Sequence, residues 1–264
     1  PMIIAILFSA LNLTLLFYSL KNHLPLFLNA LFVLALSYSP IFYKFASSQY
    51  ADVVIGSYVF SCLYSLLQTK THNNKIFPLL SGIFLGVLSF TKNEGFLISV
   101  IIFILAIFYL SLQETKTKKI HLAYFLAGTF ISLIPLIVFR LFYAPEDPNF
   151  INGLTSIIRP STAERLKMIT AFYFLQLKNL SFNGLWILLL TSILVAGRKA
   201  FDKTIVIIPI FLCLYGGALT FYYFVNTYFE IVWWLTVTWD RVLFSILPVT
   251  FYWIGVSLFP KEKS

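Results

Sequence analysis

Long runs of apolar residues recur along the whole of this chain, and short polar stretches separate them. The runs are continuous rather than alternating, which favours membrane-spanning helices over the strands of a membrane barrel. Only 11% of the residues are charged and 59% are hydrophobic, whereas soluble domains carry about 25% charged residues. In lipid, a helix satisfies its own backbone hydrogen bonds. We therefore predict an all-α fold, a polytopic transmembrane helical bundle that forms a single domain over residues 1–264.

Hydropathy divides the chain into about nine predicted spans. These are Met2–Leu20, Leu24–Tyr38, Val53–Leu67, Ile76–Phe90, Phe96–Leu112, Ile120–Phe142, Phe182–Ala196, Thr204–Val225 and Val242–Phe259. Several are shorter than the roughly 20 residues that a perpendicular helix needs to cross a bilayer. For the short runs, a re-entrant segment or local thinning of the bilayer is the alternative interpretation.

The charged residues orient this bundle. When loops are assigned to alternate sides, the larger group of basic residues falls on one side, which the positive-inside rule makes cytoplasmic. Most acidic residues, among them Asp52, Glu94 and Asp240, fall on the other side, so we predict a polar site on the extracytoplasmic face.

The net charge of +9 is mostly a topology signal, and no basic stripe with interleaved aromatics indicates a nucleic-acid partner. The histidines are all on the cytoplasmic side, so a metal on the outer face would need carboxylate ligands.

The longest stretch outside the predicted spans, residues 143–181, contains a predicted amphipathic helix. Ser161-Thr162-Ala163-Glu164 has the pattern of a capping box at a helix start. Apolar side chains then recur at helical spacing, at Leu166, Ile169, Tyr173, Leu177 and Leu180. We expect this helix to lie on the outer membrane surface.

Three short segments on the predicted outer face carry the chemistry. They are Tyr50-Ala51-Asp52, Thr91-Lys92-Asn93-Glu94-Gly95 and Thr238-Trp239-Asp240-Arg241. Arg and Lys bind phosphate oxygens, and a carboxylate can accept the proton of an attacking hydroxyl. Simpler interpretations remain open: Asp52 as a helix cap, Lys92 paired only with Glu94, and Arg241 paired only with Asp240.

The order of these segments resembles a known family. Ser48-Gln49-Tyr50-Ala51-Asp52-Val53, followed by Gly82-Ile83-Phe84-Leu85-Gly86 and then the Thr91–Gly95 segment, is similar to the membrane-embedded GT-C glycosyltransferases. The resemblance is to the branch that holds the dolichyl-phosphate-mannose–protein mannosyltransferases and the bacterial aminoarabinose transferases of lipid A. The stretch from Arg241 to Pro248 resembles a late helix of these enzymes.

The resemblance implies an enzyme of the bacterial inner or plasma membrane, with its active face periplasmic or extracytoplasmic. It would move a sugar from a polyprenyl-phosphate donor to a hydroxyl of a lipid, glycan or protein acceptor, in contact with membrane lipid. Lys92, Asn93, Asp240 and Arg241 would then bind substrate, and Lys92 and Arg241 would stabilise the leaving phosphate. Asp52 and Glu94 would be catalytic, positioning or deprotonating the acceptor, or would hold a divalent cation.

The same resemblance places the main catalytic acid of the family on the first outer loop. That loop would precede Pro1, so we expect this chain to be the central and C-terminal part of a longer protein. The stand-alone activity of such a fragment is an open question. Two other classes also stay open: a transporter, flippase or polymerase-like protein of envelope glycan assembly, and a non-catalytic protein. Gly216-Gly217 is the midspan helix break that a transporter would use.

Overall fold

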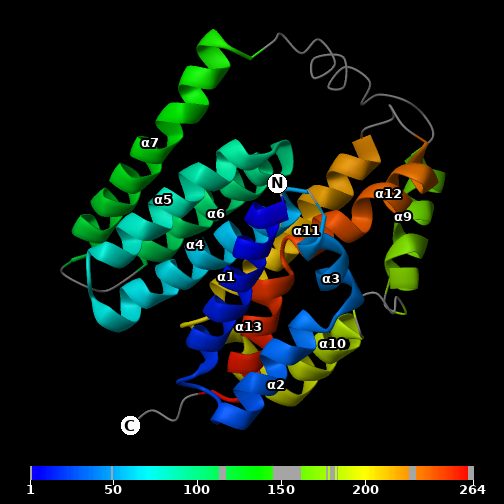
Figure 1. Ribbon diagram of the computed structural model, residues 1–264, viewed down its shortest axis with the longest axis horizontal. Coiled ribbons are helices and arrows are strands. Elements are labelled where there is room, and N and C mark those ends of the chain that lie inside the picture. The colour runs from blue at the N-terminus through cyan, green and yellow to red at the C-terminus, as the bar shows by residue number, and fades with distance from the viewer. Residues whose placement is uncertain are drawn as a thin grey trace.

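The computed structural model describes residues 2–48, 50–112, 117–144, 162–176, 178, 182, 184–225 and 230–260. Every element in these ranges is a helix (Figure 1), as the sequence predicts. They are α1 (Met2–Leu20), α2 (Leu26–Ser37), α3 (Pro40–Ala46), α4 (Asp52–His72), α5 (Ile76–Thr91), α6 (Asn93–Ser111), α7 (Lys118–Phe142), α9 (Thr162–Gln176), α10 (Leu185–Ala196), the 3-10 helix η2 (Gly197–Phe201), α11 (Ile207–Val225), α12 (Ile231–Phe244) and α13 (Leu247–Leu258).

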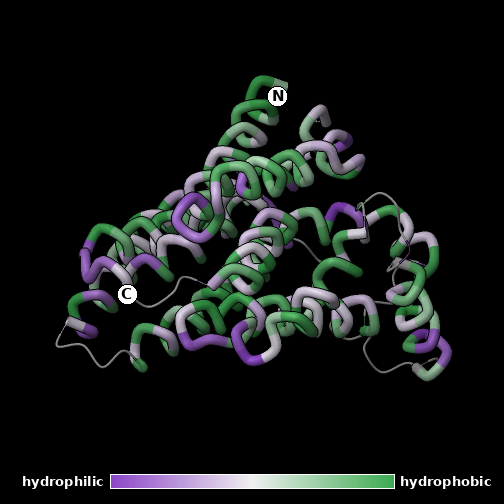
Figure 2. Tube along the Cα trace, turned by 90° about the horizontal axis from the view of Figure 1, so that it is seen from below, coloured by the Kyte–Doolittle hydropathy of each residue, from purple (hydrophilic) through white to green (hydrophobic). Residues whose placement is uncertain are grey.

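Within the described ranges, four helices are long and apolar enough to cross a membrane: α1, α6, α7 and α11. Two bent pairs, α2 with α3 and α12 with α13, raise this number to six if each pair is one span. Apolar residues dominate the helices, and polar residues gather mainly at helix ends and turns (Figure 2). These helices indicate a multi-pass membrane protein. The prediction of about nine spans is not confirmed.

Helix breaks, short helices and the low hydropathy of α4, which contains the predicted span Val53–Leu67, account for the difference. The predicted span Val242–Phe259 covers the end of α12, a bend of 52° and all of α13. The run Leu24–Tyr38 contains α2, which ends before Pro40 begins α3 at a bend of 65°. A proline disfavours helical conformation in the residue before it, so helices tend to end there. Helices α5 and α10 have only 16 and 12 residues.

Helix α4 is the centre of the bundle. It contacts α1, α5, α6, α12 and α13, and most of its 21 residues are buried. Asp52 at one end and Gln68-Thr69-Lys70 near the other lower its mean hydropathy, although its middle is apolar. A helix surrounded by other helices needs no continuous lipid-facing surface, so α4 can carry polar residues near its ends.

Helix α7 packs on α5 through small residues. A Cβ atom added to Gly82 would lie 2.2 Å from the carbonyl oxygen of Phe125, and one added to Gly128 would lie 2.3 Å from that of Leu79. At Gly86 the same atom would lie 2.0 Å from Ser132 Oγ. The Gly82–Gly86 pair therefore forms a small-residue helix interface of the kind common in membranes. Figure 1 shows α7 beside α5, with its C-terminal end extending away from the other helices.

A helix is present where the amphipathic one is predicted, as α9, but Leu166 of the predicted apolar face is exposed, so its amphipathic character is not confirmed. Its Ile169 is fully buried, and the Tyr173 hydroxyl lies 2.5 Å from Thr220 Oγ1 on α11. The helix thus packs against α11 and α12, while its place on the outer membrane surface stays a prediction. Ser161 of the capping box, Leu177 and Leu180 lie outside the described residues.

Helix α11 is continuous from Ile207 to Val225. The prediction of a midspan helix break at Gly216-Gly217 is therefore wrong. A Cβ atom added at either glycine would meet no atom within 4 Å among the described residues. These glycines leave open space beside an intact helix.

Helix α12 begins with a carboxylate cap. Glu230 Oε2 accepts a hydrogen bond from the Trp233 N–H at 2.6 Å, and Oε1 accepts one from the Val232 N–H at 2.9 Å. The Trp233 bond first, and then the Val232 bond, lower the pKa of Glu230 below its usual value. Because the folded state favours the charged form, Glu230 stabilises the fold above the unfolded-state pKa of about 4.3. This contribution is lost as the pH falls through the lower, folded-state pKa.

We therefore expect the Glu230→Gln variant to unfold at a lower temperature than the parent protein at neutral pH. The difference between the two should shrink as the pH is lowered toward about 3, because both side chains are then uncharged. Far-UV circular dichroism in detergent across this pH range measures the effect. A difference that stays constant with pH would show that the charge of Glu230 is not involved.

Candidate functional site

Asp52 occupies the first turn of α4, where the helix dipole favours a negative charge. It does not cap the helix, since Ala51 is the cap residue and makes no side-chain cap bond. The Asp52 side chain is only 3% exposed. A buried carboxylate is tolerated when cations or donors compensate it, and here two cations from distant segments do so.

Lys92 is the first of these cations. It lies in extended conformation, with φ of −170° and ψ of 164°, between the end of α5 and the start of α6. Its Nζ is 3.4 Å from Asp52 Oδ1 and 3.1 Å from Glu94 Oε1. Gly95 permits this tight connection, because a Cβ atom there would lie 2.5 Å from the carbonyl oxygen of Leu88. Lys92 thus contacts both carboxylates, and not Glu94 alone.

Arg241 is the second cation and lies in the last turn of α12. Its Nε donates to Asp52 Oδ2 at 3.0 Å, and its guanidinium carbon lies 4.2 Å from the centre of the Tyr50 ring. Close packing of α4 on the α12–α13 bend brings the two segments together: a Cβ atom at Gly56 would lie 3.4 Å from the Ser245 carbonyl oxygen.

The four residues Asp52, Lys92, Glu94 and Arg241 form what we term the charge cluster. The side chains of Lys92, Glu94 and Arg241 are 28%, 33% and 24% exposed, so each remains accessible from outside. Two positive and two negative charges meet, with the buried Asp52 between the two cations. Asp52 therefore fixes the positions of a lysine and an arginine while leaving part of each able to contact an anionic ligand.

The other two predicted site residues are not part of the charge cluster. Asn93 begins α6 with an exposed side chain. Asp240 is partly buried on α12 and interacts electrostatically with Lys44. The ion pair of Arg241 in the described part of the chain is with Asp52, so the interpretation that it pairs only with Asp240 is wrong.

The residues present do not fit a divalent cation. In the described ranges, no group of three or more His, Cys, Asp or Glu side chains could hold a metal ion. Each Asp52 oxygen already faces a cation, and Glu94 faces Lys92. Ca²⁺ and Mg²⁺ need several oxygen ligands at one point, so we derive no step from a metal.

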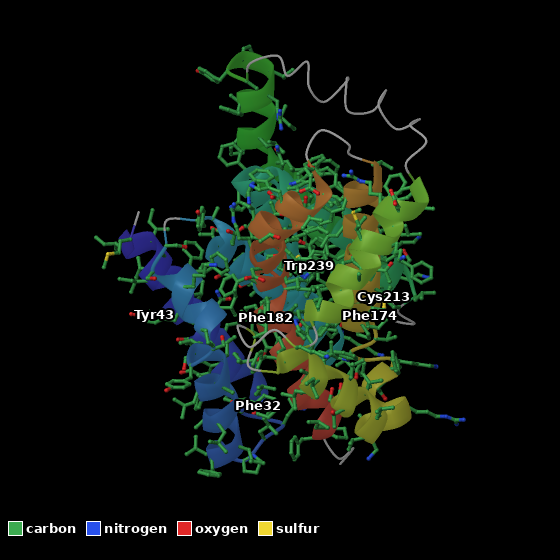
Figure 3. The ribbon with its side chains drawn as sticks, turned by 90° about the vertical axis from the view of Figure 1, so that its right-hand side faces the viewer. Phe32, Tyr43, Phe174, Phe182, Cys213 and Trp239 are labelled. Atoms are coloured by element: carbon green, nitrogen blue, oxygen red, sulfur yellow. The ribbon has the colours of Figure 1, made fainter. Side chains whose placement is uncertain are left out.

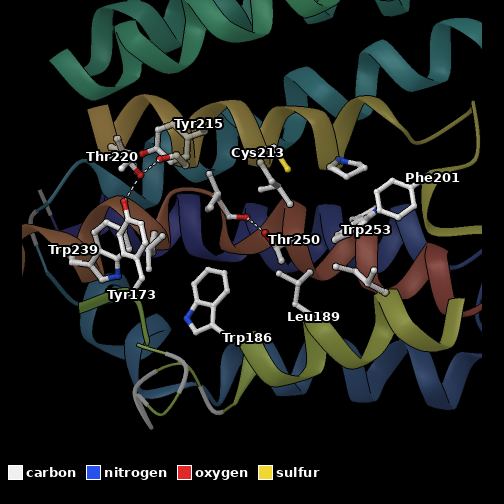
Figure 4. A pocket seen from close by; sticks show the side chains of 17 residues that line it. Tyr173, Trp186, Leu189, Phe201, Cys213, Tyr215, Thr220, Trp239, Thr250 and Trp253 are labelled. Carbon is white, nitrogen blue, oxygen red and sulfur yellow. Dashed lines mark hydrogen bonds between the residues drawn. The ribbon is translucent and has the colours of Figure 1, made fainter. Parts of the chain in front are cut away.

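A cavity of about 370 Å³ lies beside the charge cluster, among α9, α10, α11, α12 and α13. Sequence reasoning did not find it. Tyr215 and Trp239 line the end near the cluster, and Phe201 and Trp253 line the opposite end (Figure 4). The Tyr215 hydroxyl donates to the Val242 carbonyl oxygen at 3.3 Å, which links the cavity wall to the residue after Arg241. The only available signal was the density of aromatic residues, which also suits an interfacial belt.

Comparison with family models, with curated proteins and with solved structures found no match to this chain.

Proposed function

We propose that this chain is an integral-membrane glycosyltransferase, similar to the GT-C enzymes, that moves a sugar from a polyprenyl-phosphate donor to an acceptor hydroxyl. The observation that carries the proposal is the convergence of Lys92 and Arg241 on one buried carboxylate, Asp52. Three segments far apart in the sequence meet at one place in a chain that is otherwise poor in charge. A buried carboxylate is costly unless cations pair with it, and here the buried Asp52 holds two cations that remain partly exposed.

In the proposed reaction the donor phosphate lies against the exposed parts of Lys92 and Arg241. The acceptor oxygen forms a bond to the anomeric carbon, and the bond from that carbon to the phosphate oxygen breaks. The electron pair of the broken bond goes to the phosphate, whose developing charge the two cations stabilise. Glu94, the more exposed carboxylate, takes the proton of the acceptor hydroxyl. Asp52 keeps both cations in place, because each of its oxygens contacts one of them.

Transport of a lipid-linked sugar or small solute is the second candidate function. The bends of 65° between α2 and α3 and of 52° between α12 and α13 support it, since transporters often bind substrates at broken helices. The second bend follows Arg241 closely in the sequence. The charge cluster would then bind an anionic solute without chemistry.

Replacing Lys92 by alanine tests the proposal. We expect transfer of a radiolabelled sugar from a polyprenyl-phosphate donor, measured in membranes, to fall about 100-fold, because one group that stabilises the leaving phosphate is lost. Lys167→Ala is the matched control, since Lys167 is an exposed lysine on α9, and it should leave the rate unchanged. Transfer that persists in Lys92→Ala would contradict the site. Sugar-phosphate uptake without transfer would favour transport.

A further inference from the structure

The cavity beside the charge cluster has two different ends. Figure 4 shows Tyr173 and Trp239 together at one end, Trp186 between this pair and Leu189, and Phe201 and Trp253 at the other end. Its volume of about 370 Å³ lies within the range of small-molecule sites. Figure 3 looks on to this side of the molecule, with Trp239 and Cys213 labelled. Cys213 is exposed although it lines the cavity, so the cavity is open to the surroundings of α11.

Two buried hydrogen-bond donors belong to tryptophans that line the part of the cavity between the Tyr173 end and Leu189. In the described part of the chain, neither Trp239 Nε1 nor Trp186 Nε1 has an acceptor, although both atoms are buried. Trp239 is only 6% exposed, and its ring lies 4.6 Å from that of Tyr173, centre to centre. A buried donor without an acceptor is unfavourable, and native structures usually supply a partner. An acceptor oxygen of a ligand in this part of the cavity would supply the missing partner.

We propose that this cavity binds one ester-linked acyl chain of a membrane glycerolipid, with the ester carbonyl oxygen accepting hydrogen bonds from the Trp239 and Trp186 indoles. The remaining walls are largely apolar, contributed by residues such as Leu189, Leu212 and Leu243. They suit a hydrocarbon chain. An isoprenoid chain is equally apolar but has no carbonyl, so it would leave the two indoles unpaired. The indoles therefore favour an acyl ester.

The dimensions agree with this occupant. On α11 the lining residues extend from Pro209 to Thr220, which at about 1.5 Å per residue corresponds to roughly 16 Å of helix. The hydrocarbon of one leaflet is about 15 Å thick, half of the roughly 30 Å bilayer core. The cavity can thus hold much of one acyl chain. A lipid could occupy this cavity whether or not the protein transfers a sugar.

A pair of lipids that differ only in the carbonyl tests the indole contacts. The purified, delipidated protein is titrated with dioleoyl phosphatidylcholine and with its diether analogue, and binding is measured by native mass spectrometry. We expect the ester lipid to bind about tenfold more tightly, since each hydrogen bond contributes roughly three- to tenfold. Trp239→Phe and Trp186→Phe, which keep an aromatic ring, should each remove about threefold or more of this preference. Trp233→Phe, at an exposed position on α12, should keep it.

The cavity itself is tested by filling it. Leucine at position 216 should project into the cavity without a clash, since Gly216 lines it and open space surrounds the position. We expect Gly216→Leu to weaken lipid binding more than tenfold and Gly217→Leu, at a neighbouring open position outside the lining, to leave it unchanged. Bound lipid should also slow maleimide labelling of Cys213. Equal affinity for ester and ether lipids, or unchanged binding in Gly216→Leu, would overturn the proposal.

Discussion

The Arg241→Met variant is expected to lower the free energy of unfolding by about 3 kcal/mol, because it leaves the buried carboxylate of Asp52 with Lys92 as its remaining ion-pair partner. The Lys92 contact is the longer of the two, at 3.4 Å against 3.0 Å for Arg241. Methionine keeps most of the apolar stem of arginine. The lost stability is therefore that of the positive charge and its hydrogen bond to Asp52. The unfolding midpoint follows from the labelling of buried Cys62 by a maleimide dye as the temperature rises, in a Cys213→Ser background.

Removing the charge of Asp52 as well provides the control. Asp52→Asn combined with Arg241→Met takes away both members of the pair, so most of the lost stability should return. Arg241→Lys should lie between the parent and Arg241→Met, because lysine keeps the charge but loses the planar group over Tyr50. An unfolding midpoint in Arg241→Met equal to that of the parent would show that the contact with Asp52 adds nothing to stability.

The Gly82→Leu variant is expected to lower the free energy of unfolding by more than about 3 kcal/mol, which is more than the effect of Arg241→Met. The Cβ atom of the leucine alone would lie 2.2 Å from the Phe125 carbonyl oxygen and 2.8 Å from the Thr129 nitrogen. Both are backbone atoms, so no side-chain rotation relieves the clash, and α7 must move away from α5. The same Cys62 labelling assay measures the effect.

Gly217→Leu is the matched comparison for this change. It makes the same substitution in a helix, but a Cβ atom there meets no atom within 4 Å in the described ranges. Leucine also favours a helix over glycine by roughly 0.5–1 kcal/mol. We therefore expect Gly217→Leu to be neutral or slightly stabilising. If both variants unfolded alike, the small-residue interface would not be what holds α7 to α5.

The helices were predictable because apolar runs and polar interruptions are local properties of the sequence. The run Met2–Leu20 coincides with α1, and Ile120–Phe142 lies within α7. The number of spans was not predictable in the same way. Hydropathy averages across a bend such as that before Leu247, and it cannot show that α4 is covered by other helices. Both the bend before Leu247 and the burial of α4 depend on packing between segments that are distant in the sequence.

The candidate site was predictable as a set of residues but not as a geometry. Four of the six predicted residues meet: Asp52, Lys92, Glu94 and Arg241. Assigning loops to alternate sides predicted that these residues share one face. It did not predict which acid pairs with Lys92 or with Arg241. Arg241 has an acid next to it in the sequence, yet its ion-pair partner is 189 residues away. Tertiary packing, such as that of Gly56 against Ser245, brings Arg241 to Asp52, and the sequence does not show this packing.

The two contacts of Asp52 also imply an order of assembly. Lys92 is 40 residues from Asp52 in the chain, and Arg241 is 189 residues away. During synthesis from the N-terminus, the lysine is therefore made long before the arginine. We infer that Lys92 is the interim counter-charge that lets the α4–α6 part enter the membrane with Asp52 already neutralised. Once it is made, Arg241 adds the second ion pair of Asp52 and so links α12 to α4.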